Sequence, residues 1–115
     1  MTFEDKVRVL EDLYRWFNRR EIDRVLWALS PTVRWPNVIE RTEIHGHEAV
    51  RAYWSKQFQT IEPLVEPVGF QDRDSSVAVR VHQVVRIKAT GQVVESDVTH
   101  AFSFDQLLIT SMVVS

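Results

Sequence analysis

The chain has 115 residues, 44% of them hydrophobic, which is enough for one core and predicts a single domain over residues 1–115. Fourteen Lys and Arg against sixteen Asp and Glu give a formal net charge of -2, so no basic excess favours nucleic acid. The absence of cysteine excludes disulfides, thiolate nucleophiles and cysteine-ligated metals. No apolar run approaches the roughly 20 residues that span a bilayer, and no secretory signal pattern opens the chain, so we expect no membrane partner and a cytoplasmic location.

The N-terminal segment predicts a pair of helices. Thr2 and Asp5 have the spacing of an N-terminal cap, and apolar residues then recur at helical spacing over residues 3–18. The same period continues over residues 22–29 and stops before Pro31, because proline disfavours a helical residue before it.

A short strand and a third helix are expected next. Residues 32–35 are β-prone and end at Pro36, which cannot donate a hydrogen bond to a central ladder. An amphipathic helix is predicted to follow Gly46 and to close at Pro63.

The C-terminal half alternates apolar and polar residues with a period of two, which is typical of strands. Four strands are predicted, over residues 64–71, 76–88, 92–104 and 107–114. Helices first and strands later predict an α+β domain in which three N-terminal helices pack on a strongly curved antiparallel sheet.

The charge pattern selects the register of the hairpin around Gly91. Pairing that gathers the valines on one sheet face leaves the charged residues on the other, whereas a one-residue slip would bury arginines at high free-energy cost. The inner face would contain Val77, Val79, Val81, Gln83 and Val85 with Val94, Val98, His100, Phe102 and Phe104. The outer face would contain Arg80, His82 and Arg86 with Glu95, Asp97 and Thr99.

Three segments also carry a resemblance to a known family: Trp35-Pro36-Asn37, Ile44-His45-Gly46 and the run from Thr99 to Phe104. In segment order and length the chain resembles SnoaL-like proteins of the nuclear transport factor 2-like superfamily, which includes ketosteroid isomerases and polyketide cyclases. The resemblance implies a single cone-shaped SnoaL-like domain with an apolar pocket, and a homodimer formed through the sheet.

The chain departs from ketosteroid isomerases at each residue of their mechanism, so we do not expect ketosteroid isomerisation by that mechanism. That mechanism uses an aspartate base, a tyrosine and a protonated aspartate. Alignment to such an isomerase places Trp35 at the base, His100 at the protonated acid and Leu13 at the tyrosine, with Tyr14 one residue away. The resemblance still implies an apolar cone in which His100 is the ionisable group.

His100 is the candidate catalytic residue, as a general acid or base or as a group that orients the substrate. The alternative is a structural histidine bonded to Gln83, a tyrosine hydroxyl or a backbone carbonyl. Candidate substrate-binding residues are Gln83, Tyr14, Trp35, Trp54 and Phe58, for which a place in the core is the alternative.

Other histidines suggest weaker sites. His45 and His47 flank Gly46 without a third ligand nearby, so we expect no metal. His82 and Asp97 are expected on the outer sheet face as a cross-strand or dimer-interface pair. Glycine-rich nucleotide loops are missing, and no cofactor is predicted.

Two hypotheses follow. The first is a small-molecule pocket protein, with isomerase, cyclase or hydrolase chemistry on a hydrophobic carbonyl-type compound. The second is a noncatalytic dimeric module for ligand binding or interaction. The sequence does not decide whether the protein is an enzyme.

Overall fold

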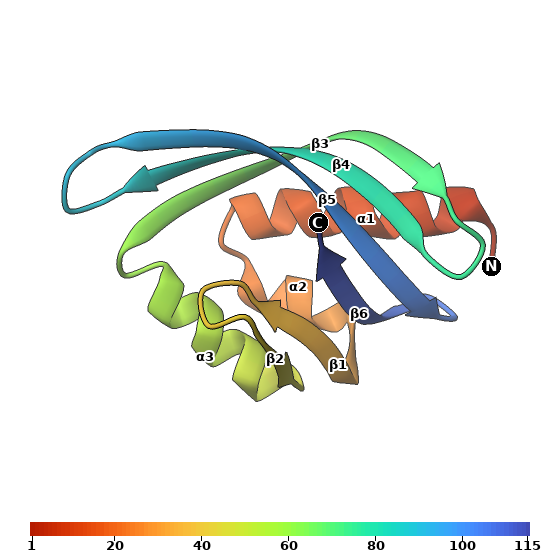
Figure 1. The fold of residues 1–115 in the computed structure, drawn as a ribbon. Helices are drawn as coiled ribbons and strands as arrows, with labels where there is room; N and C mark the ends of the chain where they lie inside the picture. The colour runs from red at the N-terminus through yellow and green to blue at the C-terminus, as the bar shows by residue number, and fades with distance from the viewer.

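The computed structural model describes residues 1–115 as three helices and one six-stranded, strongly curved sheet that does not close (Figure 1). The elements in chain order are α1 (Phe3–Asn18), α2 (Ile22–Trp27), β1 (Leu29–Asn37), β2 (Thr42–His45), α3 (His47–Gln57), β3 (Ile61–Asp72), β4 (Val77–Ile87), β5 (Val93–Asp105) and β6 (Leu108–Val114). The α+β class and the three helices are confirmed.

Helix α1 begins and ends with specific hydrogen bonds. At its start Thr2 Oγ1 accepts from the amide of Asp5 at 3.1 Å, and the amide of Thr2 donates to Asp5 Oδ2 at 3.2 Å. This capping box satisfies two free amides and confirms the predicted start. At its end the Asn18 side chain bonds both the carbonyl and the amide of Val65, at 2.7 and 2.9 Å, which attaches α1 to β3.

Helix α2 is shorter than predicted. It ends at Trp27, because the next residues already belong to the sheet: the amide of Ile109 donates to the carbonyl of Ala28 at 2.9 Å, and Leu29 pairs with Ile109. Tertiary pairing thus overrides the helical period, and the predicted end at residue 29 is wrong.

Helix α3 follows Gly46, whose φ of +87° lies in the region that favours glycine. It ends at Gln57, and Ile61 already pairs with Ile87, so the predicted closure at Pro63 is wrong. Pro63 lies inside β3. That position tolerates a missing amide hydrogen because β3 is an edge strand.

The sheet has the strand order β2-β1-β6-β5-β4-β3. The predicted antiparallel meander from β3 to β6 is confirmed. Strand β1 pairs antiparallel with β2 and parallel with β6, and it is longer than the predicted 32–35. Strand β2 is a four-residue edge strand that was not predicted from the sequence.

The predicted register of the β4–β5 hairpin is confirmed. Val79 lies opposite His100, Val81 opposite Val98, and His82 opposite Asp97. The inner face of the sheet therefore holds the valines together with His100, and the outer face holds His82.

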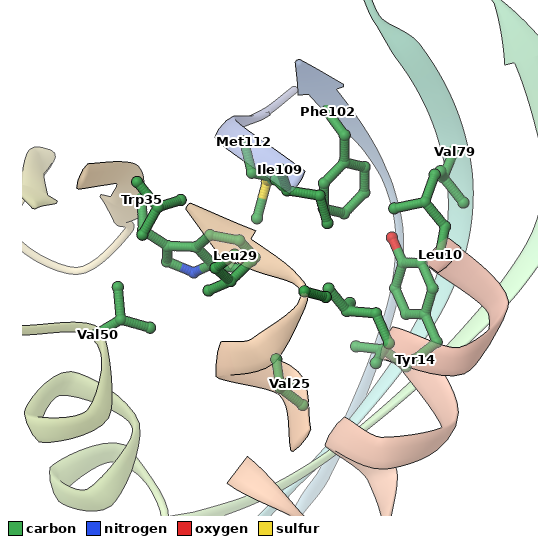
Figure 2. Packing of buried hydrophobic residues seen from close by; sticks show 14 of the residues in the cluster. Leu10, Tyr14, Val25, Leu29, Trp35, Val50, Val79, Phe102, Ile109 and Met112 are labelled. Carbon is green, nitrogen blue, oxygen red and sulfur yellow. The ribbon is translucent and has the colours of Figure 1, made fainter. Parts of the chain in front are cut away.

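The core lies between the helices and the inner face of the sheet. Figure 2 shows Leu10 and Tyr14 from α1, Trp35 from β1 and Phe102 from β5 converging on it. None of the helices combines the length and apolar character that crossing a membrane would require.

Candidate functional site

A cavity of about 280 Å³ lies between the helices and the curved sheet. Its wall is formed by helices α1 and α3, strands β1 and β3 to β6, and the turn after β1. Its lining residues are Leu13, Tyr14, Phe17, Trp35, Pro36, Val38, Ile39, Tyr53, Trp54, Gln57, Ile61, Pro63, Val65, Gln83, Val85, Val98, His100, Phe102, Met112 and Val114. Because Val38 and Ile39 are 59% and 77% exposed, the cavity reaches the surface at the β1–β2 turn.

The wall contains no Asp, Glu, Lys or Arg. Its polar atoms belong to two tyrosines, two glutamines, two indoles and His100. A charged group placed inside would lose its hydration without gaining an opposite charge, which costs free energy. The cavity therefore suits an uncharged, largely apolar molecule.

Tyr14 and His100 form a buried polar pair in the wall of this cavity. The Tyr14 hydroxyl lies 2.7 Å from His100 Nδ1, although 86 positions separate the two residues. Their rings are stacked, with centroids 5.9 Å apart and planes 7° from parallel. Both side chains are at least nine-tenths buried. Of the partners considered from the sequence for His100, the structure selects a tyrosine hydroxyl.

Burial keeps both members of this pair uncharged at neutral pH. Loss of hydration lowers the pKa of His100 to about 4, because a buried imidazolium is disfavoured. Loss of hydration also raises the pKa of Tyr14 well above its ordinary value. At neutral pH the pair is a phenol and a neutral imidazole, and His100 is a weak base there.

The second ring nitrogen of His100 is the one open to a ligand. The hydrogen bond of this ring is at Nδ1. No fully buried side-chain nitrogen or oxygen is left without a partner, so Nε2 retains open surface. Since His100 is part of the cavity wall, that surface faces the cavity.

Aromatic rings form the wall around the pair. Trp35 and Trp54 meet edge to face with centroids 5.3 Å apart, and Phe102 lies 6.3 Å from Trp35. Phe17 meets Trp54 in the same manner at 5.4 Å. These contacts hold both tryptophans almost fully buried while part of each lines the cavity.

Gln83 lies on the cavity face of β4, opposite Ser96. Its amide makes no hydrogen bond to another side chain or to the backbone, and it does not contact His100 through one. Gln83 was one of the partners expected for His100 from the sequence. In the structure it lies separately in the wall, half-buried and free to contact a ligand.

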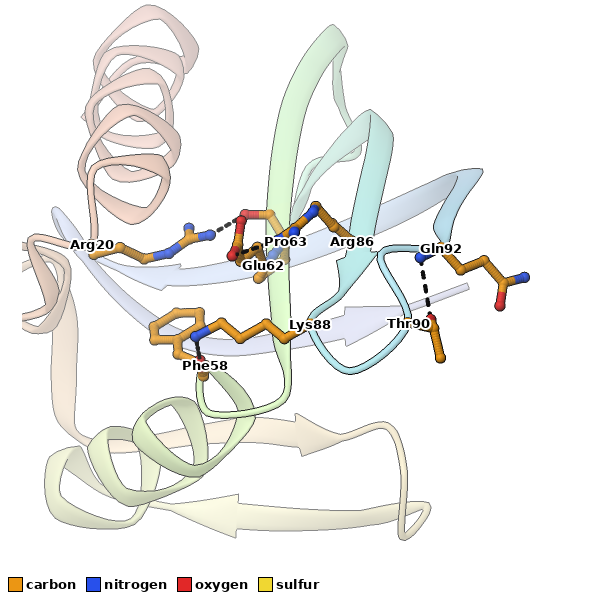
Figure 3. A network of polar contacts seen from close by, with 8 residues as sticks. All are labelled: Arg20, Phe58, Glu62, Pro63, Arg86, Lys88, Thr90 and Gln92. Carbon is orange, nitrogen blue, oxygen red and sulfur yellow. Dashed lines mark hydrogen bonds and ion pairs between the residues drawn. The ribbon is translucent and has the colours of Figure 1, made fainter.

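Phe58 is the one predicted substrate-binding residue that does not line the cavity. It follows α3 and packs behind the wall, 5.6 Å from Phe17, under the guanidinium of Arg20 at 4.6 Å. Figure 3 shows this region, where Arg20 also donates to the carbonyl of Pro63 and Lys88 donates to the carbonyl of Phe58. Helix α3 ends at Gln57, and Phe58 is its C-cap residue.

Several lining residues were not predicted from the sequence. Tyr53 and Gln57 of α3 line the cavity, and Gln57 Nε2 donates to the Tyr53 hydroxyl at 3.3 Å. Val38 and Ile39 form the mouth. Two adjacent apolar residues in a turn were the available signal for them.

The remaining histidines lie outside the cavity and have separate partners. His45 bonds Glu43, and His47 bonds the carbonyl of Leu29. His82 bonds Asp97 and Glu95, each at 3.0 Å. No group of three or more His, Asp or Glu side chains is arranged to hold a metal ion.

The sequence profile of the SnoaL-like domain matches residues 10–112, which is most of the chain. The protein belongs to the SnoaL-like domain family. The comparison with curated proteins found no match.

Solved structures share the fold of this SnoaL-like domain. An NTF2-like protein of unknown function from Burkholderia pseudomallei is 23% identical, with a TM-score of 0.88. The alignment covers 100% of this chain and 91% of the Burkholderia chain. TerC, crystallised with polyporic acid, is 18% identical over 96% of this chain and 90% of its own, with a TM-score of 0.86. An LEH-like epoxide hydrolase from M. tuberculosis is 17% identical over 96% of this chain and 81% of its own, with a TM-score of 0.81.

The cavity of this SnoaL-like domain differs from a ketosteroid isomerase site in its chemistry. Such an isomerase uses an aspartate base and a second, protonated aspartate. Here Trp35 and His100 line the cavity and no carboxylate does. Proton abstraction by an aspartate is therefore not available inside this cavity.

Proposed function

We propose that this SnoaL-like domain binds a hydrophobic, uncharged, carbonyl-type small molecule in the cavity and orients its oxygen at His100. The observation that carries the proposal is the buried Tyr14–His100 pair, which is a polar group in the wall of a largely apolar cavity without charges. A polar group there fixes the orientation of a ligand, and the apolar wall supplies most of its affinity.

The residues of the cavity have different roles in binding, according to their positions. Trp35 and Trp54 offer aromatic surface to the ligand body, and Gln83 offers an amide to a second polar group. Tyr14 holds His100. Phe58 supports the wall from behind through Phe17 and does not touch the ligand.

The reaction classes that fit are isomerisation, cyclisation and hydrolysis, with His100 exchanging a proton or orienting the substrate. Support comes from relatives of the same fold, among them an LEH-like epoxide hydrolase and an epoxide hydrolase/cyclase-like enzyme. The low pKa of His100 favours orientation of the substrate over proton abstraction, because a neutral imidazole of low basicity removes protons poorly.

A second candidate is a noncatalytic dimer that binds a ligand or a partner. The outer sheet face favours it, because Leu64, Val93 and Val113 lie there and each is more than half exposed. We propose that two copies pair through this face. Replacing Val113 by Asp should convert a dimer to a monomer in light scattering after gel filtration, and a wild-type monomer would contradict the pairing.

A thermal-shift screen tests the first candidate. The panel would hold apolar ketones, lactones, epoxides and the corresponding carboxylates. A ligand at about 100 times its dissociation constant stabilises the native state by about 2.7 kcal/mol, a shift of several degrees for a domain of this size. We expect hits among the uncharged compounds that disappear in His100→Ala and persist in His45→Ala, a matched change of an exposed histidine outside the cavity.

Two outcomes would contradict this proposal. One is a panel in which only the carboxylates bind. The other is hits that persist in His100→Ala. Incubation of each hit with the protein, followed by chromatography coupled to mass spectrometry, then separates an enzyme from a binding module, because the chromatography also resolves isomers of unchanged mass.

A further inference from the structure

The hydrogen bond between Tyr14 and His100 contains one proton. Its position decides whether the cavity presents a hydrogen-bond donor or an acceptor to a ligand. Either the phenol donates to Nδ1, and Nε2 carries the ring proton, or Nδ1–H donates to the phenol oxygen, and Nε2 carries a lone pair. The first arrangement presents a donor to the ligand. The second presents an acceptor.

The surroundings of the Tyr14 hydroxyl distinguish these arrangements. This hydroxyl has His100 Nδ1 as its sole partner, and the side chain is 3% exposed. Figure 2 shows the ring reaching from α1 toward the sheet, among Leu10, Val79 and Phe102, none of which has a side-chain acceptor. If Nδ1 carried the proton, the phenol hydrogen would be buried without an acceptor, which is the costly case for a hydrogen-bonding group.

In the opposite arrangement, no buried polar hydrogen lacks an acceptor. The phenol hydrogen is satisfied at Nδ1, and the remaining ring proton is on Nε2, which has open surface in the cavity wall. A ligand can satisfy that proton. Burial keeps both groups neutral, so neither a phenolate nor an imidazolium competes at neutral pH.

We infer that Tyr14 fixes His100 as the Nε2–H tautomer, so that the cavity binds its ligand through an acceptor oxygen and not through a donor group. This inference rests on the proposed function and gives the physical reason for its preference for carbonyl compounds, such as ketones, lactones and quinones: the cavity presents a hydrogen-bond donor to the ligand oxygen. A neutral imidazole that donates to a carbonyl also stabilises negative charge that develops on that oxygen. His100 is then an electrophilic group, and Tyr14 is a positioning residue that acts through it.

Nitrogen NMR of the ligand-free protein tests the tautomer without any ligand. In protein labelled with 15N at histidine, the His100 signals are assigned by their loss in a Tyr14→Phe/His100→Phe double variant, which removes both partners of the bond. We expect Nδ1 to have the shift of an unprotonated ring nitrogen and Nε2 that of a proton-bearing one. In Tyr14→Phe alone the two shifts should move toward each other as the tautomers mix. A protonated Nδ1 in the wild-type protein overturns the inference.

Three isosteric tricyclic probes test the ligand preference. Fluorenone has a carbonyl acceptor, carbazole has an N–H donor, and fluorene has neither. Relative to the double variant, the wild-type protein should favour fluorenone over fluorene by about two- to tenfold, the range of one neutral hydrogen bond. Carbazole should gain nothing, and in Tyr14→Phe its relative affinity should rise.

The outcomes separate this inference from the proposed function. A wild-type preference for carbazole, relative to the double variant, overturns the donor assignment while it supports the pocket. Failure of all three probes to bind counts against the proposed pocket, and the NMR experiment still decides the tautomer.

Discussion

Acidification is expected to destabilise the protein through His100. Burial holds the pKa of this imidazole at about 4, below the ordinary 6.5 that it regains on unfolding. Between these values the unfolded state binds a proton that the folded state excludes. The stability that follows from the neutral histidine is therefore complete above pH 6.5 and is lost as the pH falls toward 4.

The size of this effect follows from the two pKa values. They differ by 6.5 − 4 = 2.5 units, and one unit corresponds to about 1.36 kcal/mol. Full acidification should therefore cost about 3 kcal/mol. The side chain is 8% exposed, so solvent screening reduces this figure little. Because a domain of this size has about 5–15 kcal/mol of stability in total, the loss is large enough to measure.

Urea denaturation at a series of pH values measures it. The reference is the Tyr14→Phe/His100→Phe double variant, which replaces both hydrogen-bonding partners by apolar rings of similar shape. Carboxylates titrate in both proteins, so their contribution cancels in the difference. The difference in unfolding free energy should fall between about pH 6.5 and about pH 4 by up to about 1.4 kcal/mol per unit. Parallel stability curves for the two proteins would refute the buried, neutral state of His100.

Three further predictions follow from other contacts. Hydrogen bonds to two carboxylates raise the pKa of His82, so its stabilisation is present just below pH 6.5 and is lost as the pH rises. In the same urea series, His82→Gln should be less stable than wild type at about pH 5 and equal to it in base. Tyr14→Phe leaves His100 Nδ1 without its partner and should cost about 1–3 kcal/mol in urea denaturation at pH 7, and a loss below about 0.5 kcal/mol would contradict the bond. Thr2→Ala removes the acceptor for the Asp5 amide and should cost about 1 kcal/mol, with reduced protection of the first helical amides in hydrogen exchange; unchanged protection would contradict the cap.

Local signals in the sequence were sufficient for the first helix and for the central hairpin. The Thr2 cap and the helical period determine α1 without help from the rest of the chain. The β4–β5 register follows from the cost of burying Arg80 and Arg86 among valines. In both cases the information lies within one or two neighbouring elements.

Signals that depend on distant pairing were not sufficient. The end of α2 is set by Ile109, far along the chain, which takes Leu29 into the sheet. Phe58 shares the helical period of Trp54, yet α3 ends before it because Ile61 joins β4. A periodic pattern gives the direction of a face but not the residue at which an element stops.

The candidate site shows the same division. The alternation along β5 placed His100 on the inner face, and helical spacing placed Tyr14 on the inner face of α1. Whether the two side chains meet depends on how α1 crosses the sheet. The two hydrogen bonds from the Asn18 side chain to the backbone of Val65 help to determine that crossing. The sequence therefore left a tyrosine, Gln83 and the backbone as equal partners for His100, and the packing selected Tyr14.

The absence of charged side chains in the cavity wall limits the reactions that this member of the family can catalyse. A carboxylate base can remove a proton or activate water without help, whereas a neutral imidazole of low pKa can do neither well at neutral pH. It can hold a carbonyl oxygen and stabilise the charge that develops there. If the domain is a catalyst, its substrate must therefore supply most of the reactivity, as in an isomerisation or ring closure of a compound that already ionises easily. If it is a binding module, the same hydrogen bond and the same aromatic wall are sufficient to bind the ligand. Turnover of a bound ketone therefore distinguishes a catalyst from a binding module.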